Sequence, residues 1–195
     1  MFIEAFTRLA NARRMHIKNT RKKVTDFLGA ESEDNIIFTQ SATDSLNLLA
    51  YGLEDLVNEG DEVICSELEH HANFVPWQQL CRRKRALFKV IPQQDGELDI
   101  AWLNRNISPK NRIVACCHVS NVTGTVNQVN EICEIARKFG ALTVIDGAQA
   151  LRHGKINVRD LGCDFYCFLR TQDHGPMWNR RPIRENEPPK SASAI

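Results

Sequence analysis

Hydrophobic positions along the chain follow two spacings in turn, and this alternation predicts helices and strands. Helical spacing covers residues 9–28, 43–51, 74–85 and 129–139. Short apolar runs, which indicate strands, cover residues 35–39, 62–66, 87–92, 113–119, 142–145 and 165–168. Strands that alternate with helices are typical of an α/β fold with a mostly parallel sheet and helices on both faces. The dipeptide Asp95-Gly96 predicts a turn after the third strand.

Polar segments follow four of the predicted strands. They cover residues 39–43, 66–71, 118–121 and 146–149. The carboxyl ends of parallel strands meet at one rim of a sheet, and ligands of α/β proteins bind at that rim. We therefore expect the candidate functional residues in these four segments.

Composition excludes several function classes. The 195 residues correspond to about one domain, and 25 Lys and Arg against 24 Asp and Glu argue against nucleic-acid binding through bulk charge. The sequence contains no apolar run long enough for a membrane span and no secretory signal in residues 1–14. Seven cysteines without a Cys-x-x-Cys pair exclude zinc ribbons and predict buried, reduced thiols in the cytoplasm.

Two of the four segments carry candidate catalytic groups. Asp146 ends a buried strand, either as a structural carboxylate or as the group that keeps a pyridine nitrogen protonated, as pyridoxal phosphate sites require. Gln149 follows as a donor to the phenolic oxygen of that cofactor. His70 and His71 are adjacent, so their side chains point apart, and no third metal ligand is evident. We therefore favour an imidazole stacked on an aromatic cofactor over a metal site, with an exposed histidine pair as the alternative.

The other two segments suit anion and ligand binding. Residues 39–44, Thr-Gln-Ser-Ala-Thr-Asp, lie between a strand and a helix. Backbone N–H groups at such a helix start bind phosphate, although an N-cap at Ser41 or Thr43 explains the same residues. Asn121 follows the most apolar strand and is a further candidate for a ligand contact.

Taken together, these segments resemble the class V aminotransferase family of pyridoxal-phosphate enzymes. The matching motifs are FTQSATDSLNLLA, ICSELEHHANFVPWQQL, HVSNVTGT, VIDGAQA and LGCDFYCF, in family order over about residues 20–168. Within the family the chain is similar to cysteine desulfurases of the SufS/CsdA type, close to selenocysteine lyases. The resemblance implies part of the large domain of a fold-type-I transferase, with pyridoxal phosphate as cofactor. It also implies L-cysteine as substrate, a homodimer, and sulfur transfer for iron–sulfur cluster assembly through a persulfide.

The resemblance also implies a role for each matching position. Ala42 and Thr43 hold the cofactor phosphate, and Ser41 stands where the family usually has glycine. His70 stacks on the ring and moves protons, which makes it the candidate catalytic residue. The cofactor-binding set comprises Ala42, Thr43, His70, Asn121, Asp146 and Gln149, and no metal is implied.

Two departures from the family predict an inactive chain as written. Gln172 occupies the position of the lysine that binds the cofactor as a Schiff base, and an amide nitrogen is not a nucleophilic amine. The part of the family with the persulfide cysteine and the substrate-binding arginine has no counterpart, so the chain resembles a fragment. Three functions stay open: a desulfurase-like fragment, a non-catalytic partner of an intact desulfurase, and a selenocysteine lyase or other class V enzyme. The predicted organisation is a leading helix over 1–30, part of the cofactor domain over 31–168, and a disordered, non-family tail over 169–195.

The codons that can encode residues 169–195 allow a second interpretation of this tail, in which they are read in another frame. Codons for Arg170 to Asp173, read one base later, permit Gly-His-Lys-Thr, and the third residue must be Lys or Arg. The codons of Met177, Trp178 and Asn179 force Cys-Gly in that frame. The whole shifted sequence permits Ser-Gly-His-Lys-Thr-Met-Gly-Pro-Cys-Gly-Ile-Gly-Val-Leu-Tyr-Gly, which resembles the missing family motif. We therefore expect a shift of reading frame near Phe168 and Leu169.

Overall fold

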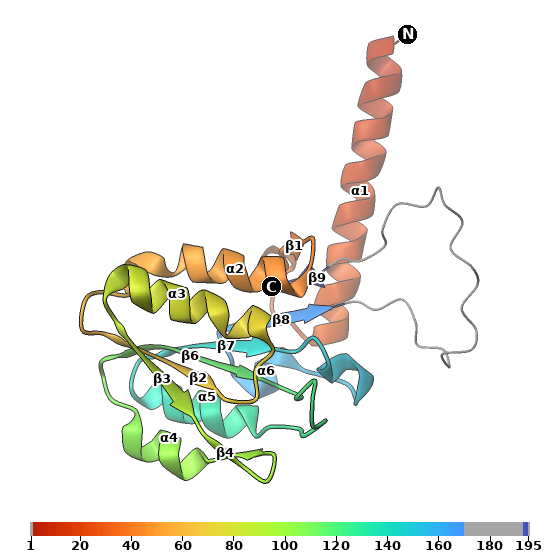
Figure 1. The fold of residues 1–195 in the computed structure, drawn as a ribbon. Coiled ribbons are helices and arrows are strands. Elements are labelled where there is room, and N and C mark those ends of the chain that lie inside the picture. Colours follow the sequence, from red (N-terminus) through yellow and green to blue (C-terminus); the bar gives the residue numbers. More distant parts are fainter. Residues whose placement is uncertain (1, 170–192, 195) are drawn as a thin grey trace.

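The computed structural model describes residues 2–169 and 193–194, with side chains described over residues 14–169. A twisted sheet lies between two layers of helices, and a long N-terminal helix projects away from this body (Figure 1). The strands are β1 (Phe38–Thr39), β2 (Glu62–Ser66), β3 (Leu87–Ile91), β6 (Asn111–Cys117), β7 (Leu142–Asp146), β8 (Phe165–Leu169) and β9 (Ser193–Ala194). Their spatial order is β1-β9-β8-β7-β6-β2-β3. The five strands from β8 to β3 are parallel, whereas β9 is antiparallel to both of its neighbours.

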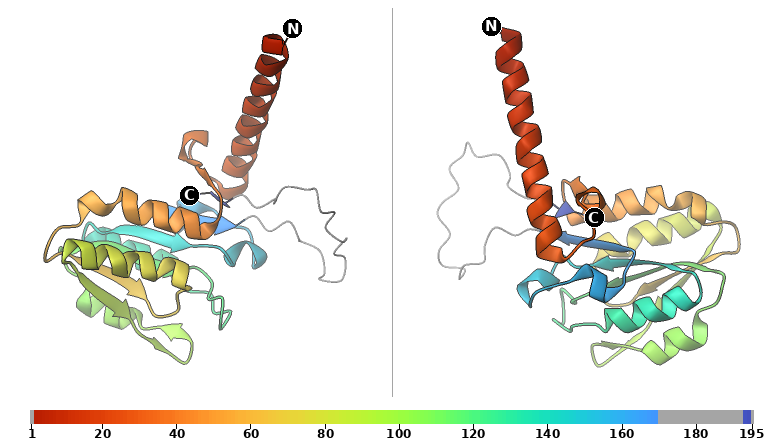
Figure 2. Two further views of the ribbon diagram at one scale, coloured as in Figure 1. Left: turned by 45° about the horizontal axis from the view of Figure 1, so that its top comes forward. Right: turned by 180° about the vertical axis from the view of Figure 1, so that it is seen from behind.

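The helices are α1 (Phe2–Leu28), α2 (Ala42–Gly52), α3 (Val75–Lys84), α4 (Ile100–Asn106), α5 (Val129–Lys138) and α6 (Val158–Leu161). Helices α2 to α5 cover the two faces of the sheet, whereas α1 projects away from it (Figure 1, Figure 2). Single turns of 3-10 helix are η1 (Glu33–Asn35), η2 (Glu54–Leu56), η3 (His71–Asn73) and η4 (Ala150–Arg152). Helices α2 and α3 lie on one face, and α4 and α5 lie on the other (Figure 2). None of the helices within the described residues has the length and apolar character to cross a membrane.

The core consists of two apolar clusters, one on each face. In β2, Val63 and Cys65 face α2 and α3, whereas Ile64 faces the opposite cluster, which contains residues of α5. Strands β6, β7 and β8 divide their side chains between the clusters in the same alternating way. This alternation is the period of two that the pleat imposes. The predicted α/β fold with helices on both faces is therefore confirmed.

The predicted elements differ from the observed ones mainly at their ends. The expected strand over 35–39 is split into η1 and the two-residue β1, and the expected strand over 113–119 is β6, Asn111–Cys117. The Asp95-Gly96 turn closes a small hairpin between β4 (Gln93–Gln94) and β5 (Glu97–Leu98). Both turn residues have positive φ, as a two-residue hairpin of this type requires. Helices α4 and α6 were not predicted.

Of the predicted tail, residues 169–195, the structure describes only residues 169, 193 and 194. Leu169 completes β8 and pairs with Ser193 of β9, which also pairs with β1. Residues 170–192, which include Gln172 and most of the tail expected to be disordered and to derive from a shifted frame, lie outside the described residues.

Candidate functional site

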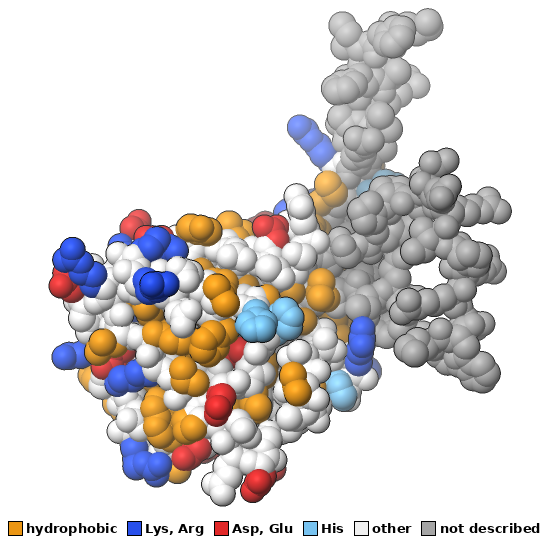
Figure 3. All heavy atoms as spheres, viewed as in Figure 1, with side chains coloured by type: hydrophobic (Ala, Val, Ile, Leu, Met, Phe, Trp, Pro, Cys, Tyr) orange, Lys and Arg blue, Asp and Glu red, His pale blue; other side chains and the backbone are white. Residues whose placement is uncertain are grey.

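The six residues expected to bind the cofactor lie around one cavity of about 140 Å³. Its lining residues are Ala42, Thr43, His70, Ala72, Cys117, Val119, Asn121, Asp146, Ala148, Gln149 and Leu169. They belong to the start of α2 and to the carboxyl ends of β2, β6, β7 and β8. This volume is smaller than the roughly 300–1000 Å³ of a typical ligand pocket. The exposed histidines lie beside hydrophobic side chains on one face of the molecule (Figure 3).

Asp146 is the last residue of β7, and its carboxylate is buried. Its Oδ1 accepts a hydrogen bond from the backbone N–H of Ala148 at 2.9 Å. Among the described residues it has no lysine or arginine within ion-pair distance. Burial raises the pKa of Asp146, although the Ala148 N–H and the nearby His70 act in the opposite direction. A buried carboxylate without a cation beside a cavity suits a cationic N–H donor in that cavity.

His70 lies at the turn between Glu69 and η3, with its side chain exposed. Its Nδ1 accepts a hydrogen bond from the backbone N–H of Ala72 at 3.1 Å. Because Nδ1 is the acceptor, the neutral imidazole carries its proton at Nε2. The structure therefore fixes both the orientation and the tautomer of this ring.

The start of α2 has the features of an anion site. Ser41 is the N-cap, and its side chain accepts from the N–H of Asp44 at 3.0 Å. The N–H groups of Ala42 and Thr43, at the first two helical positions, have no acceptor among the described residues. Unpaired N–H groups at a helix start attract anions, and the helix dipole adds to the effect. The N-cap interpretation is thus correct for Ser41, and it leaves two donors available beside the cavity.

Two amide side chains complete the cavity wall. Asn121 is exposed in the loop between Val119 and Val126, which form an antiparallel bridge. The hydroxyl of Ser120 holds that loop by accepting from the N–H groups of the second and third residues that follow it. Gln149 precedes η4 and makes no capping hydrogen bond with its side chain. Both amides are available to a ligand.

Gly147 brings the strand end close to an aromatic ring. A Cβ at this position would overlap the side chain of Tyr166. We expect Gly147→Ala to lower the free energy of unfolding by about 1–3 kcal/mol, because the ring or the backbone must move. Gly52→Ala is the matched control: no atom lies within 4 Å of its Cβ position, and alanine is favoured at a helix end with ordinary φ. Urea denaturation of both variants checks the prediction, and equal stabilities would contradict it.

Glu69 was not singled out by the sequence analysis, although it belongs to a motif that was. Its Oε1 accepts from the N–H of Cys117 at 2.6 Å and from the hydroxyl of Ser66. Its Oε2 accepts from the side-chain amide of Asn73 at 2.6 Å. Burial, together with the charge of Asp146, raises the pKa of Glu69 to about 7. No sequence pattern reveals this contact, because Cys117 lies 48 positions further along the chain.

The raised pKa of Glu69 predicts a pH-dependent stability. The folded chain binds this proton more tightly than the unfolded chain, whose pKa is near 4.5. The stabilisation is complete below pH 4.5 and is lost as the pH rises towards 7. We expect the titration of Glu69 to contribute a fall in the free energy of unfolding over this window, with a slope of at most about 1.4 kcal/mol per pH unit from this one group. Urea titrations between pH 4.5 and 8 measure the slope, and Glu69→Gln should flatten it.

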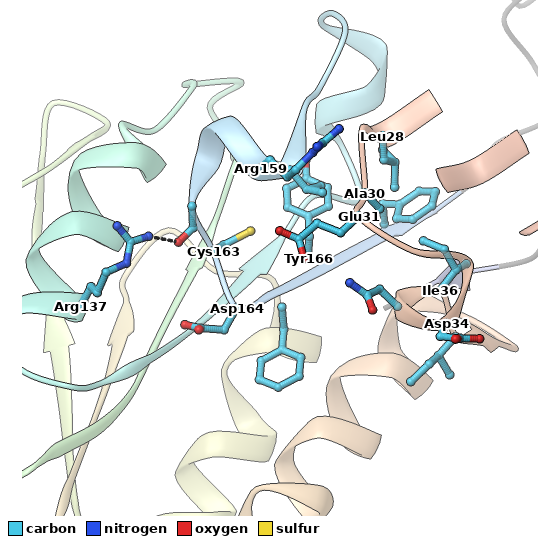
Figure 4. A pocket seen from close by; sticks show the side chains of 16 residues that line it. Leu28, Ala30, Glu31, Asp34, Ile36, Arg137, Arg159, Cys163, Asp164 and Tyr166 are labelled. Carbon is cyan, nitrogen blue, oxygen red and sulfur yellow. Dashed lines mark hydrogen bonds between the residues drawn. The ribbon is translucent and has the colours of Figure 1, made fainter. Parts of the chain in front are cut away.

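A larger cavity of about 660 Å³ lies elsewhere on the chain, between the end of α1, η1, α6 and β8 (Figure 4). Its guanidinium groups are already engaged: Arg137 donates to the carbonyl of Gly162 at 2.6 Å, and Arg159 donates to the carbonyl of Gly29. Cys163 lines it with a thiol whose pKa is raised by burial to about 12, which disfavours the thiolate. None of the six candidate residues lines this cavity. The described residues also contain no group of three His, Cys, Asp or Glu side chains placed to hold a metal ion.

The sequence profile described as aminotransferase class-V matches residues 4–176. The chain belongs to this family. A probable cysteine desulfurase of Halalkalibacterium halodurans is 44% identical over 162 residues, which are 82% of this chain and 40% of that protein. The structure of the cysteine desulfurase CsdA from Escherichia coli, an S-sulfonic acid form, is 34% identical with a TM-score of 0.75 and covers 82% of this chain and 41% of its own. This chain covers about 40% of the length of the Halalkalibacterium halodurans protein and of a cysteine desulfurase from Salmonella newport, which is 42% identical over 163 residues.

Family membership implies pyridoxal phosphate as the cofactor. The structure of a C-DES mutant, with glycine covalently linked to its own pyridoxal phosphate, is 23% identical with a TM-score of 0.71, covers 80% of this chain and 43% of its own, and shows the same fold. The residues at the smaller cavity fit the group by their chemistry. Within the part of the chain that the structure describes, Asp146 forms no ion pair with Lys or Arg, and the N–H groups of Ala42 and Thr43 have no acceptor. In the same part, Gln149 makes no capping hydrogen bond with its side chain.

Proposed function

We propose that the described part of the chain binds pyridoxal phosphate at the smaller cavity, as the cofactor-binding portion of a cysteine desulfurase-like protein. The convergence of six side chains from four chain segments on one cavity carries the proposal. The relatives support L-cysteine as the substrate class, with L-alanine and an enzyme persulfide as products. The matched portion spans about 40% of those relatives, so the activity of the whole protein is part of the proposal.

Each side chain has a task that its contacts define. The bound cofactor supplies an electron sink that stabilises negative charge on the substrate. Asp146 would hold the ring nitrogen and keep it protonated, and that nitrogen would supply a cationic donor for the buried carboxylate. His70 would contact the cofactor through its Nε2–H, because its Nδ1 accepts from Ala72. The N–H groups at the start of α2 would hold the phosphate, and Asn121 and Gln149 would donate to the phenolic oxygen.

We propose that binding in this chain is non-covalent, because Gln172 stands at the Schiff-base position of the family motif. Titration of the purified chain with pyridoxal phosphate, followed by quenching of tryptophan fluorescence, should give saturable binding. Inorganic phosphate should compete if the start of α2 holds the phosphate group. Borohydride treatment and peptide mapping should find no adduct at a single lysine. Binding that does not saturate would refute cofactor binding at this cavity. One specific lysine that carries the reduced adduct would refute the non-covalent mode of binding.

We further propose that residues 169–195 derive from a shifted reading frame. The forced Cys-Gly pair and the near-forced lysine in the shifted codons support this interpretation. The test is to sequence transcript and genomic template from the codon of Cys163 past that of Ile195. A frame that continues through Ser-Gly-His-Lys into a cysteine-bearing domain is expected. Transcripts that retain Gln172 and encode no family motif in any frame would sink the idea.

A second candidate function is that of a non-catalytic partner of an intact desulfurase. Gln172 favours it, because a chain without the lysine retains the fold without the covalent chemistry. Relatives that act as homodimers would offer the interface, and the cytoplasm suits the seven free cysteines. Co-expression with a full-length desulfurase and size-exclusion chromatography discriminate the two functions. A stable complex of this chain with the desulfurase supports the partner role, and separate elution of the two folded proteins contradicts it.

A further inference from the structure

We propose that Glu69 is a positioning residue for His70: its carboxylate joins the diverging ends of β2 and β6 and thereby fixes the turn that carries the imidazole over the cavity. The inference rests on the proposed cofactor binding at that cavity. Glu69 itself does not line the cavity. It acts through the hydrogen bonds that connect it to the neighbouring turn.

The first step is the divergence of the two strands. Strands β2 and β6 pair as far as Cys65 and Ala115. Beyond this point the pairing of β2 with β6 ends, whereas its pairing with β3 continues through Ser66 and the bond from the N–H of Glu67 to Ile91. The N–H of Cys117 therefore has no acceptor on β2, and Glu69 Oε1 supplies one at 2.6 Å. A side-chain carboxylate thus replaces a ladder hydrogen bond at the end of the strand.

The second step connects this carboxylate to the turn. Glu69 Oε2 accepts from the side-chain amide of Asn73, which is fully buried. The N–H of Asn73 donates to the carbonyl of His70 at 2.9 Å, and its side-chain carbonyl accepts from Trp77 Nε1 at 2.9 Å. The carbonyl of His70 is thus bonded to η3, and its imidazole Nδ1 is bonded to the Ala72 N–H of the same turn. A continuous hydrogen-bonded path leads from the sheet to the ring.

The third step is the charge around Glu69. The groups that act on it electrostatically or by hydrogen bonds come from three elements: Ser66 on β2, Cys117 on β6 and Asp146 on β7, besides Asn73 in η3. No arginine or lysine forms an ion pair with it among the described residues. Three donors converge on the carboxylate without a counter-charge, so its hydrogen bonds, not an ion pair, define its position.

The test compares Glu69→Gln with Asp164→Asn in the full 195-residue chain. Asp164 is the matched control, because its carboxylate also accepts from a strand N–H, that of Thr143 at 2.8 Å, but at the opposite ends of the strands. The first measurement is NMR of the histidine rings in the ligand-free chain. Glu69→Gln should shift and broaden the His70 resonances and leave those of His153 unchanged. The second is the affinity for pyridoxal phosphate, which should fall about tenfold in Glu69→Gln and stay within about twofold in Asp164→Asn.

Two results would overturn the inference. One is an unchanged His70 spectrum in folded Glu69→Gln. The other is an equal loss of affinity for pyridoxal phosphate in Asp164→Asn, which would indicate general destabilisation. If Glu69→Gln does not fold, Ser66→Ala removes a single donor to the same carboxylate and should shift the His70 resonances in the same direction. An unchanged His70 spectrum in Ser66→Ala then overturns it. A wild-type chain that does not bind pyridoxal phosphate refutes the proposed function, whereas the ligand-free NMR comparison still tests Glu69.

Discussion

Replacing Asp146 with asparagine is expected to weaken pyridoxal phosphate binding about 100-fold, because the proposed site loses the carboxylate that would hold the ring nitrogen, and no other carboxylate among the described residues lines this cavity. The same change should raise the free energy of unfolding at neutral pH. Burial raises the pKa of Asp146, so the ionised side chain costs stability in the folded chain once the pH exceeds that raised value. Asparagine removes this cost and keeps the size of the side chain. Opposite effects on binding and on stability are therefore expected from one substitution.

Fluorescence titration and urea denaturation measure the two effects, with Asp160→Asn as the control at an exposed carboxylate. The stability gain should vanish below the unfolded pKa, near 3.8, where Asp146 is protonated in both states. If Asp146→Asn bound the cofactor as tightly as the wild type, Asp146 would not be the partner of the ring nitrogen.

Trp77→Ala is expected to lower the free energy of unfolding by about 3–5 kcal/mol. Trp77 is fully buried between α3 and the sheet, in the cluster that contains Leu46 and Val63. The change removes a large apolar surface and also leaves the side-chain carbonyl of Asn73 without its indole donor. Chemical denaturation followed by circular dichroism measures the loss.

Trp102→Ala is the matched control, because Trp102 in α4 is only half-buried and lies on the other face. Its cost should be less than half of that for Trp77→Ala. Trp77→Phe separates packing from hydrogen bonding, with an expected cost of about 1–3 kcal/mol from the unpaired carbonyl. Equal losses at positions 77 and 102 would contradict the structural account of the core.

The hydrophobic pattern was sufficient to predict the central strands but not every helix. β2 spans the predicted residues 62–66, because its apolar side chains face a buried environment on both sides and no competing period is present. Helix α4 was missed since it has seven residues and only Leu103 is buried, which is too short for a helical period to emerge. Its start is fixed locally instead, by Asp99 accepting from the N–H of Trp102 at 2.7 Å.

The candidate site shows a similar division. Asp146 and Asn121 were predicted together because both lie near the carboxyl end of a predicted strand, and parallel topology places such positions at one rim. Glu69 was missed because its contacts with Cys117 and Asn73 depend on how two strands separate in space. A sequence records which residues follow a strand, but it does not record where neighbouring strands diverge.

The reactivity of the seven free cysteines reports which fraction of the molecules is folded. Six of the cysteines are buried, and only Cys163 is partly accessible. Burial raises the pKa of Cys81 and Cys133 to about 11, so few thiolates exist at neutral pH in the folded chain. The number of thiols that react with an alkylating reagent in a short pulse, read by mass spectrometry, therefore counts how much of the population is open. Intact mass alone then distinguishes folded from unfolded molecules, even in a mixture that no optical signal resolves.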